Sequence, residues 1–320
     1  MNTISKGSNV NGTEAIQHIL TTEVCFRSNG LKIAGILRVP ESVKTPSAAL
    51  VIGHPGSGVK EQTAGLYAQL LAEKGFITLT FDAAHQGESE GMPRGLEDPA
   101  QRTEDFKCAV SFLHTVDLVD TAKIGVFGMC AGGGYSIAAT AADHRIKALA
   151  TIITADIGRQ FRKGGDGKQD PSVFQHLLDL AAADRTAEAK GKEPGTFPLF
   201  PATAEQAKGL NEHDYEGWEY YCTERGQHPR SMKLITWNSV DRIAGFDAFA
   251  FIDQISPRPL LMISGSKAVT LWMTQEAFAA AKAPKELLVI EGANHMALYD
   301  NPEYTKQAVA KADSFFRSVL

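Results

Sequence analysis

The sequence predicts an α/β protein built on a doubly wound, mostly parallel sheet. Short apolar runs bounded by glycine, proline and polar residues alternate along the chain with segments rich in helix formers, which is the pattern of strands connected by helices. The apolar runs are continuous, as expected for strands that are buried on both faces. The alternation is interrupted once, over residues 157–250, and then resumes. We therefore expect one large α/β unit that carries an inserted cap.

Composition narrows the class of protein. The 320 residues are 43% hydrophobic and 22% charged, with a net charge of -5, which is ordinary for a soluble globular chain. There is no basic patch dense enough to indicate nucleic acid or anionic lipid as a partner. No apolar run approaches the ~18 residues of a membrane helix. The polar beginning of the chain lacks the apolar centre of a signal peptide.

The cysteines are far apart and show no CxxC spacing, so neither a disulfide framework nor a zinc site is expected. A reducing, cytoplasmic location is the expected setting, and it would keep these side chains as free thiols. We predict no metal and no organic cofactor. We expect a small molecule as partner, and a homodimer remains open. The cysteines are Cys25, Cys108, Cys130 and Cys222.

The first part of the chain predicts a hairpin followed by alternating strands and helices. Residues 1–20 are expected to form a mobile lead-in. Two β-rich runs, residues 22–26 and 31–39, flank Asn29-Gly30, and Asn-Gly between such runs is a strong hairpin signal. The following elements are then expected in order: strand 48–53, helix 61–74, strand 76–81, helix 99–116, strand 124–127, helix 135–142 and strand 146–153.

The second part predicts the insertion and the end of the sheet. Within the insertion only residues 171–190 have a clear helical pattern. We divide the chain into a lead-in, a core of residues 21–156 and 251–320, and a cap of residues 157–250. The elements expected after the cap are strand 260–263, helix 273–282, strand 286–290 and helix 302–320.

The motif GMCAGGG at residues 128–134 carries most of the chemical information. It lies between an apolar run and a helix-forming stretch, which is the layout of a nucleophile elbow, with Cys130 as its central residue. A tight turn leaves no room for side chains at positions 128 and 132, and glycine removes the clash. An isolated cysteine would more simply be a small buried hydrophobe, but this context favours a nucleophile.

A histidine follows the last predicted strand, where a proton acceptor is needed. His295 lies in the stretch EGANHM at residues 291–296, and reactive groups of a doubly wound sheet gather at the carboxyl ends of its strands. Its imidazole can take the thiol proton and later pass it to a leaving group. The simpler alternative is a loop histidine that only binds backbone. The chain order, nucleophile first and histidine last, favours the catalytic role.

An oxyanion hole needs two backbone donors. One should be the amide of Ala131, directly after the nucleophile. The other should come from the loop HPGSG at residues 54–58; because Pro55 has no N–H, Gly56 or Ser57 must supply it. A plain glycine-rich turn is the alternative. The substrate pocket is expected to include two histidines at strand ends and three aromatic residues of the cap, although most cap aromatics should form its core. These pocket residues are His54, His85, Trp218, Tyr221 and Trp237.

Together these features resemble the α/β-hydrolase superfamily, from residue 22 to the end of the chain. Its dienelactone-hydrolase-related branch, in which the nucleophile can be cysteine, is the most similar. Residues 54–62 and 94–99 are closer still to a bacterial group of poorly defined hydrolases related to fungal polyketide thiohydrolases and acyltransferases. The resemblance implies about eight strands and a lid. Its anchors are His54-Pro55-Gly56, Asp82 with Gly87-Glu88-Ser89, residues 128–133, and Gly292-Ala293-Asn294-His295.

The sequence departs from this family in its acid. The family places a carboxylate just after the penultimate strand, but the loop here reads SGSKAV at residues 264–269, with Val269 where aspartate is expected. Asp156 follows the preceding strand and is our first candidate to orient His295, with a helix N-cap as its alternative role. A thiol can rest as a thiolate–imidazolium pair, in which the acid mainly fixes a tautomer. The weaker candidates are Asp241, Asp247 and Glu276.

These expectations combine into a cysteine-nucleophile hydrolase that cleaves an ester, thioester or lactone through an acyl-enzyme. Thioesters and activated lactones suit a thiol nucleophile better than amides do, because they release better leaving groups. Two alternatives remain. One is an acyltransferase that uses the same Cys130–His295 site, and the other is a catalytically silent binding protein that keeps the fold.

Overall fold

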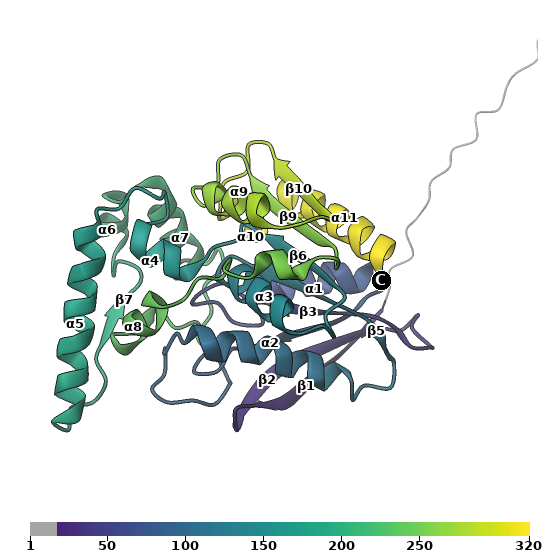
Figure 1. Ribbon diagram of the computed structural model, residues 1–320, viewed down its shortest axis with the longest axis horizontal. Helices are drawn as coiled ribbons and strands as arrows, with labels where there is room; N and C mark the ends of the chain where they lie inside the picture. The colour runs from purple at the N-terminus through teal and green to yellow at the C-terminus, as the bar shows by residue number, and fades with distance from the viewer. Residues whose placement is uncertain (1–17) are drawn as a thin grey trace, which may run out of the picture.

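The computed structural model describes residues 18–320, and its centre is a single eight-stranded sheet (Figure 1). The strand order is β1-β2-β4-β3-β5-β6-β9-β10. β1 and β2 pair antiparallel, β2 runs antiparallel to β4, and the other six strands are parallel. The strands are β1 Ile19–Ser28, β2 Leu31–Pro40, β3 Ser47–Gly53, β4 Ile77–Phe81, β5 Val119–Met129, β6 Ala148–Ile152, β9 Leu260–Gly265 and β10 Lys285–Ile290.

The predicted hairpin is confirmed. Asn29 and Gly30 connect β1 to β2 with positive φ values of 47° and 84°, the backbone that a two-residue hairpin turn requires. Most of the predicted lead-in lies outside the described residues. Its last part is different from the prediction, because Ile19 and Leu20 already belong to β1 and pair with Pro40 and Val39.

Helices cover both faces of the sheet and bury two separate hydrophobic clusters. Alternate residues of one strand face opposite clusters: Val51 of β3 packs with the side of α2, α3 and α9, and Ile52 packs with the side of α1 and α11. This confirms the doubly wound sheet, since strands buried on both faces read as continuous apolar runs. The helices of the core are α1 Thr63–Glu73, α2 Pro99–Leu113, α3 Ala131–Ala142, η1 Ile252–Ile255, α9 Leu271–Ala280, α10 Ala297–Asp300 and α11 Pro302–Val319.

The segment between β6 and β9 lies at one end of the sheet (Figure 1). We call residues 157–250 the cap segment; the division into core and cap domains stays a prediction. Its helices bury a small cluster of their own around Phe174, Ala181 and Val240. Only α5 matches a predicted helix. The elements are α4 Ile157–Lys163, α5 Pro171–Ala189, β7 Thr196–Pro198, α6 Ala204–Lys208, α7 Glu212–Cys222, β8 Leu234–Thr236 and α8 Asn238–Ala244.

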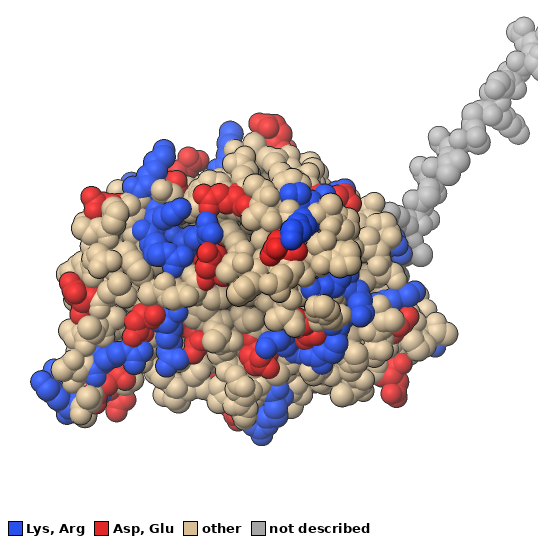
Figure 2. All heavy atoms as spheres, in the orientation of Figure 1, with Lys and Arg blue, Asp and Glu red and all other residues tan. Residues whose placement is uncertain are grey.

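Acidic and basic side chains are interspersed on the face shown in Figure 2. Within residues 18–320, no helix combines the length and apolar character needed to span a bilayer. The same part of the chain has no cluster of three or more His, Cys, Asp or Glu side chains suited to a metal ion.

Candidate active site

Cys130 occupies the sharp turn between β5 and α3. Its backbone has φ 50° and ψ -121°, a conformation that costs a non-glycine residue of order 1–3 kcal/mol and that is typical of a nucleophile elbow. A Cβ on Gly128 would lie 2.1 Å from the Ser136 Oγ, and one on Gly132 would lie 2.6 Å from the His54 carbonyl oxygen. The predicted turn and its need for glycine are therefore confirmed. The helix begins earlier than predicted, directly after Cys130.

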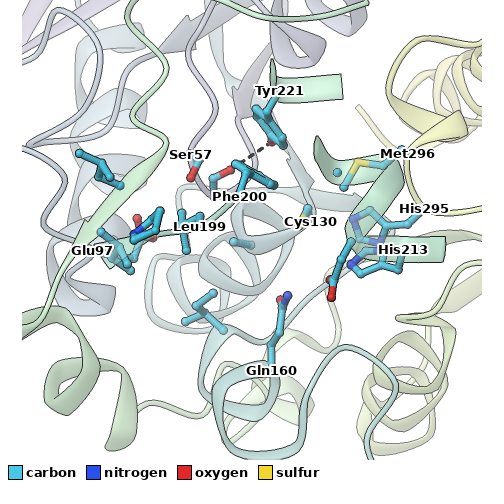
Figure 3. A pocket seen from close by; sticks show the side chains of 18 of the residues that line it. Ser57, Glu97, Cys130, Gln160, Leu199, Phe200, His213, Tyr221, His295 and Met296 are labelled. Atoms are coloured by element: carbon cyan, nitrogen blue, oxygen red, sulfur yellow. Dashed lines mark hydrogen bonds between the residues drawn. The ribbon is translucent and has the colours of Figure 1, made fainter. Parts of the chain in front are cut away.

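Two backbone amides point at the sulfur of this cysteine. The N–H groups of Ala131 and Gly56 both donate to Cys130 Sγ. Of the two donors expected from this loop, Gly56 is the one that contacts the sulfur. The carbonyl of the neighbouring Ser57 accepts from the Ser231 hydroxyl at 2.7 Å. The Tyr221 hydroxyl donates to the Gly56 carbonyl at 3.1 Å and holds the loop (Figure 3). A developing oxyanion needs two backbone donors of this kind.

His295 lies in the loop after β10 and shares a cavity with Cys130 (Figure 3). Its Nδ1 is 2.7 Å from the Thr270 Oγ1, and its Nε2 is 3.5 Å from the Tyr299 hydroxyl. The Tyr299 hydroxyl is also hydrogen-bonded to Cys130 Sγ. Tyr299 therefore connects the predicted nucleophile with the predicted base, a role that sequence reasoning missed.

The prediction that Asp156 orients His295 is wrong in this structure. Asp156 caps α4 by accepting from the Arg159 amide at 3.0 Å, and it accepts from the Ala248 amide at 2.9 Å. Its alternative role as a helix N-cap is the one observed. The weaker candidates bind arginines instead: Asp241 pairs with Arg185, and Asp247 and Glu276 pair with Arg159.

The partner of His295 is a neutral hydroxyl. Thr270 is fully buried and directly follows Val269, the position at which an acid was expected. The only feature of the sequence that could have indicated Thr270 is its hydroxyl side chain, one residue after Val269, where the acid was expected. A hydroxyl can hold the imidazole in place but cannot stabilise its positive charge as a carboxylate does.

Burial sets the protonation states of both reactive groups. It raises the pKa of the Cys130 thiol above its ordinary 9.0, and the hydrogen bonds from Tyr299, Ala131 and Gly56 oppose this only in part. Burial, followed by the charge of the adjacent His213, lowers the pKa of His295 well below 6.5. Both directions are opposite to those of a resting thiolate–imidazolium pair. These shifts favour a neutral thiol beside a neutral imidazole over the expected ion pair.

A second histidine comes from the cap segment and was missed by the sequence analysis. The ring of His213, on α7, meets the ring of His295 edge to face with centroids 5.1 Å apart. Its Nδ1 is buried and has no hydrogen-bond partner among residues 18–320. No motif surrounds this residue, since it reaches the site only through the folding of the cap segment.

The cavity that contains Cys130 has a volume of about 480 Å³. Core loops supply Gly56, Ser57, Gln86 and Glu97, and the cap segment supplies most of the apolar lining (Figure 3). This size suits a small organic molecule. The cap residues of the lining include Ile157, Phe161, Leu199, Phe200, Leu210, Leu234 and Ile235.

Of the predicted pocket residues, Tyr221 lines the cavity and the other four do not. His54 is buried behind the Gly56 loop, where its Nε2 accepts from the Ala83 amide at 3.1 Å. His85 binds the Pro93 carbonyl at 3.1 Å. The two tryptophans pack within the cap segment, Trp237 against Phe197 and Trp218 against Tyr215.

Comparison with known proteins shows the family to which the chain is similar. Residues 51–308 match the model of the alpha/beta hydrolase family. The uncharacterised protein YcjY of Escherichia coli (strain K12) is 39% identical over 85% of this chain and 89% of its own length. The crystal structure of the hypothetical protein PA2218 from Pseudomonas aeruginosa superposes with a TM-score of 0.88, at 32% identity over the whole of both chains. The thiohydrolase aneE of Aspergillus aculeatus is 28% identical over 84% of each chain.

Proposed function

Because the chain belongs to the alpha/beta hydrolase family, we propose that it cleaves an ester, thioester or lactone with Cys130 as its nucleophile. One observation carries this proposal: the sulfur stands at the elbow and receives the N–H groups of Ala131 and Gly56. Similarity to a fungal thiohydrolase supports a thioester as one substrate class. The product of the first step is an acyl group on Cys130.

Acylation follows from the placement of these groups. Cys130 Sγ forms a bond to the carbonyl carbon of the substrate, and the thiol proton passes to His295 Nε2. The carbonyl oxygen becomes an oxyanion that accepts from Ala131 and Gly56. When the tetrahedral intermediate collapses, the bond to the leaving alcohol or thiol breaks and His295 returns the proton to that leaving group.

Deacylation repeats the sequence with water. His295 takes a proton from the water as its oxygen attacks the thioester carbon of the acyl-enzyme. The bond to Sγ breaks, the free acid leaves and the thiol regains its proton. Because the resting pair is neutral, the proton must move during attack rather than before it, so the orientation of His295 by Thr270 affects the rate directly.

Intact-mass spectrometry with a panel of p-nitrophenyl esters and acyl thioesters tests the proposal. We expect an acyl adduct on the wild type and none on Cys130→Ala, with kcat/KM of the variant lower by roughly 10³-fold or more. His295→Asn should slow both adduct formation and its decay. Turnover by Cys130→Ala at the wild-type rate would rule out the cysteine mechanism.

The same experiment separates the two alternatives. If an added alcohol or amine captures the acyl group in preference to water, the protein is an acyltransferase that uses the same intermediate. If no ester or thioester in the panel forms an adduct on residue 130, the silent binding protein is the better description.

A further inference from the structure

The mouth of the cavity that contains Cys130 is lined by exposed leucines. Three of the large hydrophobic side chains that stay exposed in residues 18–320 belong to this cavity, with 38% of Leu199, 40% of Leu210 and 41% of Leu234 accessible. All three come from the cap segment. Apolar side chains that gather around one cavity, rather than singly over the surface, are typical of a ligand-binding site.

Two of these leucines lie next to each other on the two-stranded sheet of the cap segment. β7 pairs with β8 so that Pro198 is opposite Leu234. The amide of Leu199, the residue after β7, donates to the Lys233 carbonyl at 2.9 Å, directly before β8. The small sheet therefore places Leu199 and Leu234 side by side at the mouth of the cavity.

A core loop fixes the position of β8. The Thr236 amide donates to the Gly95 carbonyl at 3.3 Å, and a Cβ on Gly95 would lie 3.0 Å from the Leu234 carbonyl oxygen. Gly95 has φ 76°, which glycine adopts without strain. The two backbones approach closely because Gly95 has no side chain, so the mouth of the cavity has a defined place relative to the core.

The small sheet lies on the acyl side of Cys130. His295 protonates the leaving group, so the leaving group must lie on the histidine side of the sulfur. In Figure 3, Leu199 lies on one side of Cys130 and His295 lies on the other. The acyl chain of a substrate therefore extends from Cys130 toward Leu199 and its neighbour Leu234.

The polar side chains at this end of the cavity are bonded within the protein. Glu97 is 4% exposed; its Oε1 accepts from the Tyr135 hydroxyl at 2.6 Å, and its Oε2 accepts from the Gln86 Nε2 at 3.2 Å. The guanidinium of Arg102 lies 3.4 Å from Oε1 and balances the charge. This end of the cavity therefore does not favour a charged group on the chain, and a hydrocarbon chain suits the neighbouring apolar lining.

We propose that Leu199 and Leu234 bind the distal methylene groups of a straight aliphatic acyl chain, so that the protein selects substrates whose chain reaches the mouth of the cavity. This inference rests on the proposed function, because the roles of Cys130 and His295 define the acyl side. Each methylene group that moves from water onto the apolar lining should raise kcat/KM by about 4-fold. The gain should end once the chain passes the leucines and its further carbons lie in water.

The test compares straight-chain acyl thioesters of N-acetylcysteamine from acetyl to dodecanoyl, each assayed below its solubility limit. For the wild type, kcat/KM should rise with chain length and then level off. Leu234→Ser should lower kcat/KM for the longest chains by about 4- to 16-fold, the value of one or two methylene groups left in water, and Leu199→Ser should act in the same way. The acetyl thioester is too short to reach the leucines, so its turnover should stay within about twofold of the wild type and show that each variant is folded.

Val289→Ser is the matched control, because Val289 of β10 is an aliphatic side chain that is 39% exposed and does not line the cavity. It should keep the wild-type dependence on chain length. Wild-type rates that do not depend on chain length, or an equal loss at every length in Leu234→Ser, overturn the proposal. Light scattering adds one more outcome against it: if Leu234→Ser dissociates a dimer and leaves the dependence on chain length unchanged, the leucines form an interface with a second copy.

A binding measurement keeps this result separate from the proposed function. Primary amides of the same acids carry the same acyl chains but release a poor leaving group. Calorimetry on the wild type should show binding that tightens by up to about 4-fold per methylene group, with a smaller gain on Leu234→Ser. If the amides show this dependence but no thioester is turned over, the hydrolase proposal fails and the site for the chain stands; turnover without dependence on chain length in either measurement gives the reverse conclusion.

Discussion

The core and the cap segment contribute to the cavity in different ways. The core supplies the sulfur and two N–H donors, all placed by backbone geometry around Cys130. The cap segment supplies mainly apolar side chains from short helices and loops, such as Phe161, Leu199 and Phe200. The core has two large buried clusters, whereas the cluster of the cap segment has three buried residues. The proposed nucleophile and its two donors therefore lie in the part with the larger buried clusters, and the cap segment shapes the cavity around them.

The two parts are joined by polar contacts next to the site. Arg225 of the cap segment binds Asp300 with two bonds of 2.8 Å, and Glu216 is hydrogen-bonded by the Asn294 side chain, beside His295. Such contacts can adjust the cavity without disturbing the elbow. Changes in the core should hence affect the reaction itself, and changes in the cap segment should affect substrate choice, pH dependence and stability.

The largest effect is expected from Gly132→Ala. The new methyl group would lie 2.6 Å from the His54 carbonyl oxygen and 2.8 Å from that of Gly53, so the backbone of the elbow must shift and the Ala131 amide must move with it. We expect kcat/KM to fall by about 100-fold or more, the usual cost of losing one oxyanion donor. Stopped-flow measurement of acylation with a p-nitrophenyl ester checks this.

Gly245→Ala in the cap segment is the matched control. A Cβ at this position would have nothing within 4 Å, and the backbone has φ -85°, which alanine adopts readily. Activity should stay within about twofold of the wild type, as for most surface substitutions. Equal losses from the two glycine variants would contradict the distinction between core and cap segment.

These glycines also show what the sequence could reveal. The elbow was predictable because its tight turn leaves no room for a Cβ at Gly128 and Gly132, and the hairpin because Asn29-Gly30 suits a turn with positive φ. Thr270 was not, since a hydroxyl after a strand carries no pattern. Asp156 looked suitable by its position after β6, yet its hydrogen bonds to backbone amides hold it at the start of α4. Short cap elements such as α6 have too few residues to show a helical period.

An intermediate effect is expected from Thr270→Val, which removes the hydroxyl that holds His295 Nδ1. Misorientation of the base should lower kcat/KM by about 10- to 100-fold. Because only neutral imidazole accepts the thiol proton and burial lowers the pKa of His295 well below 6.5, the wild-type rate should decrease with acid only below that pH. A pH–rate profile whose acid limb lies at or above pH 6.5 would be inconsistent with the neutral pair.

Two further variants, one in the core and one in the cap segment, should each shift the acid limb of the pH–rate profile. Thr270→Asp places a carboxylate beside His295, and its charge should move the acid limb to higher pH. His213→Phe keeps a ring next to His295 but removes the imidazole whose protonated form lowers the pKa of His295. His213→Phe should also move the acid limb to higher pH, by less than Thr270→Asp does. Burial, the larger cause of the lowered pKa of His295, is still present in this variant.

The smallest effect is expected at Glu216, a residue of the cap segment whose side chain is hydrogen-bonded by Asn294 in the His295 loop. Burial, and then the charge of Glu212, raises the pKa of Glu216 from 4.5 to about 7. Between pH 4.5 and about 7, Glu216 is therefore protonated in the folded state and ionised in the unfolded chain. The stability that its raised pKa contributes to the fold is complete below pH 4.5 and is lost as the pH rises through about 7. Glu216→Gln keeps an amide in place of the protonated acid and removes this dependence.

Thermal unfolding from pH 4.5 to 8 measures the difference. The Tm of the wild type should decrease over this range by more than that of Glu216→Gln, and the variant should be the more stable of the two at pH 8. Glu205→Gln, on the exposed side of α6 in the same segment, should keep the wild-type pH dependence. If Glu216→Gln instead lowers the Tm at pH 8, the ionised carboxylate of Glu216 stabilises the contact between the cap segment and the core. That outcome would contradict the destabilising effect expected of the charged form.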